Sequence, residues 1–308
     1  MAELPRARSN VLTTAGLVLG AGGACLAYGA FIESRAFRLR EATARCLPPG
    51  SPSLRLLHVS DLHLAAGQRH KIDWVAGLAE LDPDLVINTG DNLSGPFPER
   101  VLEAYAGLLG RPGAFVFGSN DYLAPVAKNP LRYLGGSSAT HPQKPVSPER
   151  HLPWRPMRDA FRDAGWVDLT NARGELEVKG VRLALRGVDD PHIELDDYAA
   201  VAGPADPAAL SIGLAHAPYR RILDEMARDH VDLILSGHTH GGQVCVPGFG
   251  AVITNCDIDR ARVKGLSTHS ADGWTSLLHV SAGLGMSPFA PYRFACPPEA
   301  TLLTLLPR

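Results

Sequence analysis

Five short apolar runs in this sequence each end abruptly in Asp, Asn, His and Gly residues. The runs are LRLLHVSDLHL, LDPDLVINTGDN, GAFVFGSNDY, LSIGLAHAP and VDLILSGHTHGGQ. Segments with helical spacing of apolar residues lie between them: HKIDWVAGLAEL, ERVLEAYAGLLG, RPMRDAFRDAG and PYRRILDEMARDH. The alternation predicts an α/β fold whose polar residues gather at the carboxyl ends of the strands, where open α/β sheets bind their ligands.

Further segments predict strands outside this alternation. The segment AFRLREATARCL has partial alternation and predicts an edge strand. The stretches ELEVKGVRLALRGVDD and WTSLLHVSAG, with the closing ATLLTLL, indicate strands joined by hairpin-like turns. We expect them to form a second sheet beside the first.

The composition excludes some classes of partner. The 308 residues suffice for one large domain or two modest ones, and a net charge of -2 gives no basic footprint for nucleic acid. A nuclease would also need a basic and aromatic groove for strand binding, so no nucleic-acid partner is expected. The five cysteines contain no CxxC pair, which disfavours a thiolate zinc site.

The N-terminus predicts a membrane anchor. Residues 11–32 carry no charge, and as a helix they would be about 33 Å long, close to the thickness of a bilayer core. A cleaved signal peptide is the alternative, but the apolar stretch is longer than the usual signal core. We therefore expect residues 1–32 to anchor a single-pass membrane protein and residues 33–308 to form the catalytic domain. The Arg residues on either side do not decide which side of the membrane that domain faces.

The segment 122–156 differs from the rest in being dense in Pro, Gly and Ser. Because it begins beside the polar strand ends, we predict a lid over the site. A flexible surface insertion is nearly as compatible with this composition.

The polar strand ends together offer a set of oxygen and nitrogen ligands without thiolate. The predicted metal ligands are Asp61, His63, Asp91, Asn120, His216, His238 and His240. Such a set suits Mn, Fe, Zn, Co or Ni better than Mg or Ca alone. Seven ligands exceed the need of one ion, so we predict two divalent ions with Asp91 placed to bridge them.

Each of these motifs is weak alone, but their order and setting are specific. DLH at 61–63, GDN at 90–92, GSND at 118–121, AH at 215–216 and GHTHGG at 237–242 resemble the signature of the calcineurin-like metallophosphoesterases. The resemblance covers roughly residues 50–300. It is closer to the bacterial membrane-anchored or exported branch, whose ending reads like GLGMSPFAPYRFACPPE.

The resemblance implies a fold and a division of the ligands. The family fold is a two-sheet sandwich flanked by helices, a four-layer αββα arrangement with the metals at the strand ends. One ion would be held by Asp61, His63 and His240, and the other by Asn120, His216 and His238. Asp91 would bridge the two ions.

One motif departs from the family pattern. Where the family usually reads GNHD, this chain reads GSND, so Ser119 takes the ligand position and Asn120 that of the proton donor. An Asn side chain cannot donate a proton to a leaving alkoxide. Either Asn120 shifts to reach the metal, or it only binds the phosphate. The reaction would then depend on the metals, on another donor such as His192, or on a good leaving group. We expect Asp121 to orient a neighbouring His or the loop.

The predicted function is a two-metal-dependent phosphoester hydrolase. A hydroxide bridging the ions would attack the phosphorus of a phosphomonoester or phosphodiester, and the anchor favours a substrate linked to lipid or the cell envelope. Arg293 is a weaker candidate for contacting the phosphate. The alternative is a degenerate metal-binding scaffold without hydrolase activity, which only the altered GSND motif favours.

Overall fold

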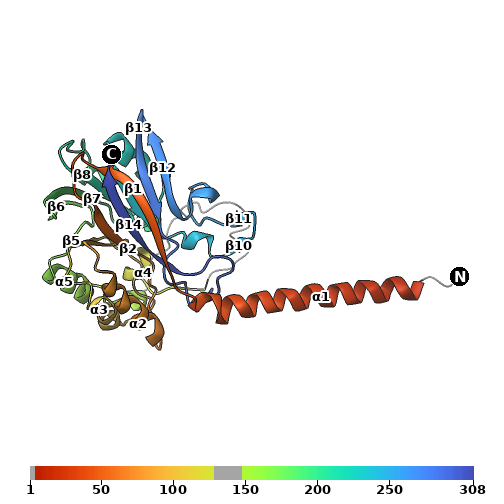
Figure 1. Ribbon diagram of the computed structural model, residues 1–308. Coiled ribbons are helices and arrows are strands. Elements are labelled where there is room, and N and C mark those ends of the chain that lie inside the picture. Colours follow the sequence, from red (N-terminus) through yellow and green to blue (C-terminus); the bar gives the residue numbers. More distant parts are fainter. Residues whose placement is uncertain (1–3, 128–147) are drawn as a thin grey trace.

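The computed structural model describes residues 4–127 and 148–308, which form two mixed β-sheets with helices on their outer faces (Figure 1). The first sheet has the strand order β1-β14-β2-β3-β4-β5 and the second the order β12-β13-β9-β8-β7-β6. In the first sheet the strands are β1 (Arg38–Leu47), β2 (Leu54–Val59), β3 (Leu85–Asn88), β4 (Gly113–Phe115), β5 (Val167–Asp168) and β14 (Glu299–Pro307). In the second they are β6 (Ala172–Val178), β7 (Val181–Gly187), β8 (Leu210–Leu214), β9 (Leu233–Ser236), β12 (Gly265–Ala271) and β13 (Trp274–Val280).

The sheets pack face to face through a shared apolar layer. Leu56 and Leu85 of the first sheet lie in one buried cluster with Leu183, Ile212 and Leu233 of the second. Strands β2, β3, β4 and β5 run parallel, as do β7, β8, β9 and β13. The polar ends of β2, β3, β8 and β9 can therefore meet at one edge of the sandwich.

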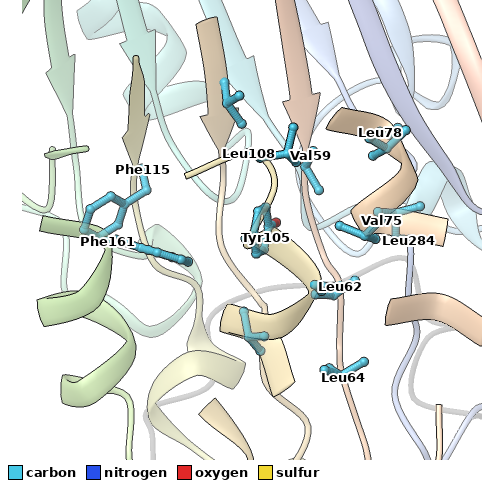
Figure 2. Close-up of a cluster of buried hydrophobic side chains, with 14 of the residues drawn as sticks. Val59, Leu62, Leu64, Val75, Leu78, Tyr105, Leu108, Phe115, Phe161 and Leu284 are labelled. Carbon is cyan, nitrogen blue, oxygen red and sulfur yellow. The ribbon is translucent and has the colours of Figure 1, made fainter. Parts of the chain in front are cut away.

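Amphipathic helices cover both outer faces and complete the four layers. The helices are α2 (Arg69–Gly77), α3 (Pro98–Tyr105), α4 (Ser119–Tyr122), α5 (Arg155–Asp163) and α6 (Arg220–Arg228). Figure 2 shows Val75, Tyr105 and Phe161 of α2, α3 and α5 packed with Val59 and Phe115 of the first sheet. Helix α6 buries Ile222, Leu223 and Met226 on the second sheet at the spacing predicted for a one-faced helix. The predicted two-sheet, helix-flanked fold is confirmed.

Shorter elements connect these layers. They comprise the 3₁₀ turns η1 (Glu33–Arg35), η2 (Leu78–Leu81), η4 (Pro148–Arg150), η5 (Pro191–Ile193), η6 (Tyr198–Ala200), η7 (His240–Gly242) and η8 (Arg260–Arg262), and a small antiparallel pair, β10 (Cys245–Val246) with β11 (Gly250–Ala251).

Two strand predictions had different outcomes. The predicted edge strand is confirmed, since β1 ends the first sheet and, among the described strands, pairs only with β14. The expectation that the closing ATLLTLL joins a second sheet is wrong, because β14 lies inside the first sheet, parallel to β1 and antiparallel to β2. Its side chains are buried over most of its length, and an apolar run of this kind fits the interior of either sheet.

The N-terminal segment forms the helix α1 (Leu4–Phe31), which projects away from the two sheets (Figure 1). Its base is fixed to the domain: the carboxylate of Glu33 accepts hydrogen bonds from the backbone N–H groups of Ala295 (3.0 Å) and Cys296 (2.6 Å). Tyr28 packs edge-on against Phe294.

The predicted membrane span is not supported. Among the residues that the structure describes, no helix is both long enough and apolar enough to cross a bilayer. The side chains of residues 11–16, the first part of the predicted span, lie outside the described ones.

Most of the predicted lid lies outside the residues that the structure describes, because these do not include its central part, residues 128–147. The described parts on either side come together, with Leu123 forming a β-bridge to His151. Trp154 packs edge-on against Phe117 and Tyr122.

Candidate metal centre

The loops that follow strands of both sheets converge at one edge of the sandwich. Asp61 and His63 follow β2, Asp91 follows β3, and Asn120 lies on the short helix α4 after β4. From the second sheet, His216 follows β8, and His238 and His240 follow β9. The predicted ligands thus come from both sheets.

Asp91 lies at the centre of this group. Its Oδ2 is 3.3 Å from Nε2 of His63, which follows a strand of the first sheet, and 3.4 Å from Nε2 of His216, which follows a strand of the second. The other carboxylate, Asp61, has Oδ1 at 3.7 Å from Nε2 of His240. The carboxylate of Asp91 therefore lies where it could bind metal ions held by histidines from both sheets.

Three histidines are oriented by hydrogen bonds at the ring nitrogen that faces away from the carboxylates. Nδ1 of His216 is 2.7 Å from the carbonyl oxygen of Thr89, and Nδ1 of His240 is 3.0 Å from that of Gly285. A carbonyl can only accept, so each Nδ1 carries a proton and each Nε2 is the nitrogen that faces the site and could bind a metal once it carries no proton. Nδ1 of His63 lies 3.2 Å from Oγ of Ser94 in the same arrangement.

His238 uses the opposite nitrogen. Its Nε2 lies 3.0 Å from the carbonyl oxygen of Asn255, so that nitrogen carries the proton and Nδ1 is the one that could bind a metal. Its ring lies against that of His216, with centroids 5.2 Å apart.

The backbone at the site adopts an uncommon conformation. Five predicted ligands have φ in the left-handed region, between 43° and 67°: Asp61, His63, Asp91, His238 and His240. Non-glycine residues seldom adopt it, although Asp and His do so more often than most. Neighbouring backbone hydrogen bonds hold these residues, for example His63 N–H to the carbonyl of Asp91 at 2.9 Å. Strain of this kind concentrates at functional sites.

Burial makes the charges of the site interdependent. Burial, together with the nearby Asp91, raises the pKa of Asp61 to about 6 and that of Asp121 to about 7. Burial also disfavours the ionised form of Asp91 and the protonated form of His216, but each group stabilises the charge of the other. The pKa of Asp91 is therefore held well below, and that of His216 well above, its usual range. A metal cation close by would stabilise the ionised form of these buried carboxylates.

The residues fit a pair of metal ions. Asp61, His63 and His240 form one group of possible ligands, and Asp61, Asp91 and His216 form another. Nε2 of His63 and Nε2 of His216 are buried without a hydrogen-bond partner among the described residues, as expected for nitrogens whose partner is a metal. A Cβ added at Gly118 would lie 2.3 Å from Oδ1 of Asp91 and 2.6 Å from Nε2 of His216, so only glycine leaves this space open.

Comparison with known proteins identifies the family. The model of the calcineurin-like phosphoesterase family matches residues 54–242, more than half of the chain. The chain belongs to this family. It is therefore a metal-dependent phosphoesterase, and the family is one of two-metal enzymes.

Several curated bacterial proteins resemble this phosphoesterase along most of their length. The uncharacterized protein YpbG of Bacillus subtilis is 28% identical, over 79% of this chain and 80% of its own. The uncharacterized metallophosphoesterase YkuE of the same organism is 26% identical, over 94% of this chain and 92% of its own. An uncharacterized metallophosphoesterase of Aquifex aeolicus is 27% identical, over 84% and 87%.

The unusual GSND motif of this phosphoesterase places Asn120 directly against Asp91. Its backbone N–H donates to Oδ1 of Asp91 at 2.8 Å, and its Nδ2 donates to Oδ2 at 2.7 Å. Rotating the amide by half a turn would bring its oxygen to the same place, so the position of Asn120 is compatible with both predicted roles.

Asp121 holds the loops rather than facing the ligands. Its Oδ2 accepts from the backbone N–H groups of Asp91 (2.8 Å) and Gly118 (3.0 Å), and its Oδ1 accepts from that of Asn92 (2.8 Å). The predicted orienting role of Asp121 is thus consistent with its contacts, which are to backbone rather than to a histidine.

His192 lies at the rim of the site. Its ring is 4.5 Å from that of His238 between centroids, and its Nδ1 is 3.0 Å from the hydroxyl of Tyr219. Asp190 accepts the backbone N–H of His192 at 2.8 Å and is itself fully buried. The structure therefore brings the predicted alternative proton donor to the side of His238.

Arg293 does not face the site as a phosphate contact would. It is fully buried, and its guanidinium donates to the backbone carbonyls of Ala282, Gly283 and Gly285 at 2.8, 3.0 and 2.6 Å. It thereby supports the segment to which His240 is hydrogen-bonded.

A buried hydrogen-bonded chain behind Asp61 was not predicted from the sequence. Oγ of Ser60 donates to Oδ2 of Asp61 at 2.7 Å, and Oγ1 of Thr89 donates to Oγ of Ser60 at 2.7 Å. Nε2 of His58 lies 2.9 Å from Thr89, and its Nδ1 lies 2.8 Å from Nδ1 of His279. The sequence signal for it is a pair of histidines within apolar strands, which fits an ordinary core position equally well.

Proposed function

We propose that this phosphoesterase hydrolyses phosphomonoesters or phosphodiesters with two divalent ions held by the seven predicted ligands. The observation that carries the proposal is the position of Asp91, whose Oδ2 lies within 3.4 Å of imidazole nitrogens from both sheets. When bound, two ions would supply an activated water for attack at phosphorus and would neutralise charge on the phosphate.

The side chains of this chain would do the remaining work. The Nδ1–H bonds of His216 and His240 to backbone carbonyls fix the direction of their Nε2 lone pairs. The amide of Asn120 can donate a hydrogen bond to a phosphate oxygen but no proton. His192, at the rim beside His238, can donate a proton to a leaving alkoxide.

The test is an assay of the full-length protein, loaded with Mn, on bis-p-nitrophenyl phosphate and on p-nitrophenyl phosphate. We expect turnover of at least one ester. Asp91→Asn should lower kcat/KM by roughly three orders of magnitude or more, because it removes both a ligand charge and the bridge. Circular dichroism checks that the variant is folded. A protein that binds two ions yet hydrolyses neither ester would instead support the scaffold alternative, which rests on the GSND motif.

The identities of the metals stay a prediction. The donor set contains imidazole and carboxylate without thiolate, which supports Mn, Fe, Zn, Co or Ni. Elemental analysis of the protein purified without added metal tests this.

The location at a membrane and a lipid-linked or envelope-linked substrate are also predictions. Exposed apolar side chains of α1, among them Leu17, Leu19 and Phe31, support them. Fractionation tests the location: the full-length protein should sediment with membranes. Recovery in the supernatant would contradict it.

A further inference from the structure

A cavity of about 300 Å³ adjoins the candidate metal centre. It lies between η1 at the base of α1, the first turn of α2 and the segment 286–291, and His63 is part of its wall. Figure 1 shows the base of α1 close to α2. A phosphoester bound at the metal centre could therefore extend one substituent into this cavity.

The cavity is lined by basic side chains. Arg35, His70 and Lys71 all contribute to its wall, whereas none of its described lining residues is Asp or Glu. Among the residues that the structure describes, no carboxylate forms an ion pair with these three side chains. An uncompensated positive group of this kind favours a bound anion.

The buried member of the group is Lys71, which is 3% exposed. Its Nζ donates to the carbonyl oxygen of Leu62 at 2.8 Å, and since an ammonium has three N–H donors, it can also donate to a ligand. Burying an ammonium without a carboxylate partner is costly, so an anion beside it would stabilise its charged form.

The helix end at this cavity points to the same ligand. The first turn of α2 contains no acidic residue, and Gln68 at its N-cap makes no capping bond with its side chain. The charge of Arg69 in this turn is compensated by Asp73 and Glu103, whereas Lys71 has no carboxylate partner among the described residues. Cations at a helix N-terminus are unfavourable, because the backbone N–H groups there already carry partial positive charge. A bound anion would offset both the charge of the basic side chains and the partial positive charge of the helix N-terminus.

The position of Asn120 indicates which anion the cavity suits. This residue stands where a proton donor would be needed for a poor leaving group, and it cannot donate a proton. A phosphomonoester is a good leaving group, since its second pKa is about 6 and it needs little protonation. A cationic cavity would also neutralise the charge that such a group gains on leaving.

We propose that the cavity formed by Arg35, His70 and Lys71 binds the second phosphate of a diphosphate diester whose first phosphate lies at the metal centre. In the hydrolysis, the oxygen of water forms a bond to the first phosphorus, and the bond from that phosphorus to the bridging oxygen breaks. The bridging oxygen and its electron pair leave with the second phosphate, the protons of the water pass to solvent, and the products are two phosphomonoesters. This inference rests on the proposed function and names its substrate class.

The kinetic test compares a nucleoside diphosphate sugar, a lipid-linked diphosphate diester in detergent micelles, and bis-p-nitrophenyl phosphate, which has no second phosphate. Arg35→Ala should lower kcat/KM for a diphosphate diester by about tenfold, the effect of one lost charge-assisted hydrogen bond. His70→Ala should lower it less, because burial and the neighbouring Arg35 lower the pKa of His70 and its ring donates an ordinary hydrogen bond. For bis-p-nitrophenyl phosphate we expect less than a twofold change. Whether the dependence on Arg35 appears with the soluble or the lipid-linked diester identifies the source of the substrate.

Arg69→Ala is the matched control. Arg69 neighbours His70 on α2, but its guanidinium pairs with Asp73 and Glu103 and does not line the cavity. This variant should leave kcat/KM unchanged for all three substrates. Equal losses on all three substrates in Arg35→Ala, or no loss on either diphosphate diester, would overturn the proposal.

A binding measurement separates this proposal from the proposed function. Inorganic diphosphate is titrated into the metal-free, full-length protein by calorimetry, where it cannot act by chelating ions. We expect binding that Arg35→Ala weakens about tenfold and Arg69→Ala leaves unchanged. Binding that is insensitive to Arg35 would overturn the subsite, whereas a protein that shows this binding but no turnover of any ester contradicts only the hydrolase.

Discussion

At the residue scale, the predicted ligands share an unfavourable backbone conformation. Asp61, His63, Asp91, His238 and His240 are all in the left-handed region, at a cost of order 1 kcal/mol or more each. Hydrogen bonds from neighbouring groups hold them there, including those that Asp61 accepts from the backbone N–H of His238 at 3.1 and 3.0 Å and from Oγ of Ser60 at 2.7 Å. The positions of these ligands therefore depend on side chains that never touch a substrate.

Ser60 is one such side chain. Ser60→Ala removes the hydroxyl that donates to Oδ2 of Asp61, so Asp61 loses one of its orienting contacts. We expect the affinity for Mn to fall about tenfold, as is typical when a partner of a metal ligand is lost. Metal titration measures the change, with Ser270→Ala on the exposed part of β12 as control. An unchanged affinity in Ser60→Ala would show that the chain behind Asp61 does not orient it.

His192 tests the source of the proton at the rim. For phenyl esters, which are poor leaving groups, His192→Gln should lower kcat by roughly 100-fold, the usual contribution of a general acid. For p-nitrophenyl esters and diphosphate diesters the decrease should be below about threefold, because these groups leave with little protonation. Steady-state kinetics on the three substrate types distinguishes these cases. A uniform decrease would assign His192 a binding role instead.

At the element scale, two buried histidines connect the sheets. His58 on β2 and His279 on β13 are both almost fully buried, and their Nδ1 atoms are 2.8 Å apart. The ionised carboxylate of Asp61 can only accept a hydrogen bond, so Ser60 donates to Asp61, Thr89 donates to Ser60, and Nε2 of His58 donates to Thr89. Nδ1 of His58 then carries no proton, and Nδ1 of His279 must be the donor between the two rings. Burial lowers the pKa of His279 to about 4 and that of His58, next to His279, well below its usual range.

This pair gives a pH dependence whose sign follows from those shifts. Between pH 6.5 and 4 the unfolded chain protonates its histidines while His279 stays neutral in the fold, so stability falls as the pH falls. From pH 7 to 5, His279 alone should account for about 2 kcal/mol of the loss in unfolding free energy. In His279→Asn, whose amide can still donate to His58, the free energy of unfolding should fall by about 2 kcal/mol less over this pH range. Urea unfolding at both pH values measures the difference, and equal pH dependence of the two proteins would refute it.

The elements differ in how far they were predictable. Polar residues after an apolar run mark a strand end whatever the sheet, so the motifs around Asp61, Asp91 and His216 located the site. Which sheet a strand joins depends on pairing over long sequence separations. That is why β14 was assigned wrongly and why the meeting of the two sheets at Asp91 emerged only from the structure. The roles of Ser60 and Lys71 could not be predicted. The hydroxyl of Ser60 is oriented towards Asp61 by Thr89, which is 29 residues away in the sequence, and the role of Lys71 depends on its burial.

At the scale of the whole molecule, metal ions would join the two sheets. The ligands around Asp91 come from both layers, so ions that bind the folded state alone should stabilise the whole domain. With free Mn at 100 times its Kd, the expected gain is about 2.7 kcal/mol for one site. Thermal unfolding with Mn or with a chelator measures it, and the Mn-dependent rise in Tm should be largely absent in Asp91→Asn. A full rise in that variant would mean that the ions bind elsewhere.

The most direct test of the central claim is the count and mutual distance of bound Mn ions. Elemental analysis with electron paramagnetic resonance on the Mn-loaded protein gives both. A pair bridged by Asp91 would lie about 3.5–4 Å apart, so we predict two ions per chain with a magnetically coupled signal that Asp91→Asn abolishes together with hydrolysis. One ion per chain in an active enzyme, or full activity with two uncoupled ions, would contradict the account.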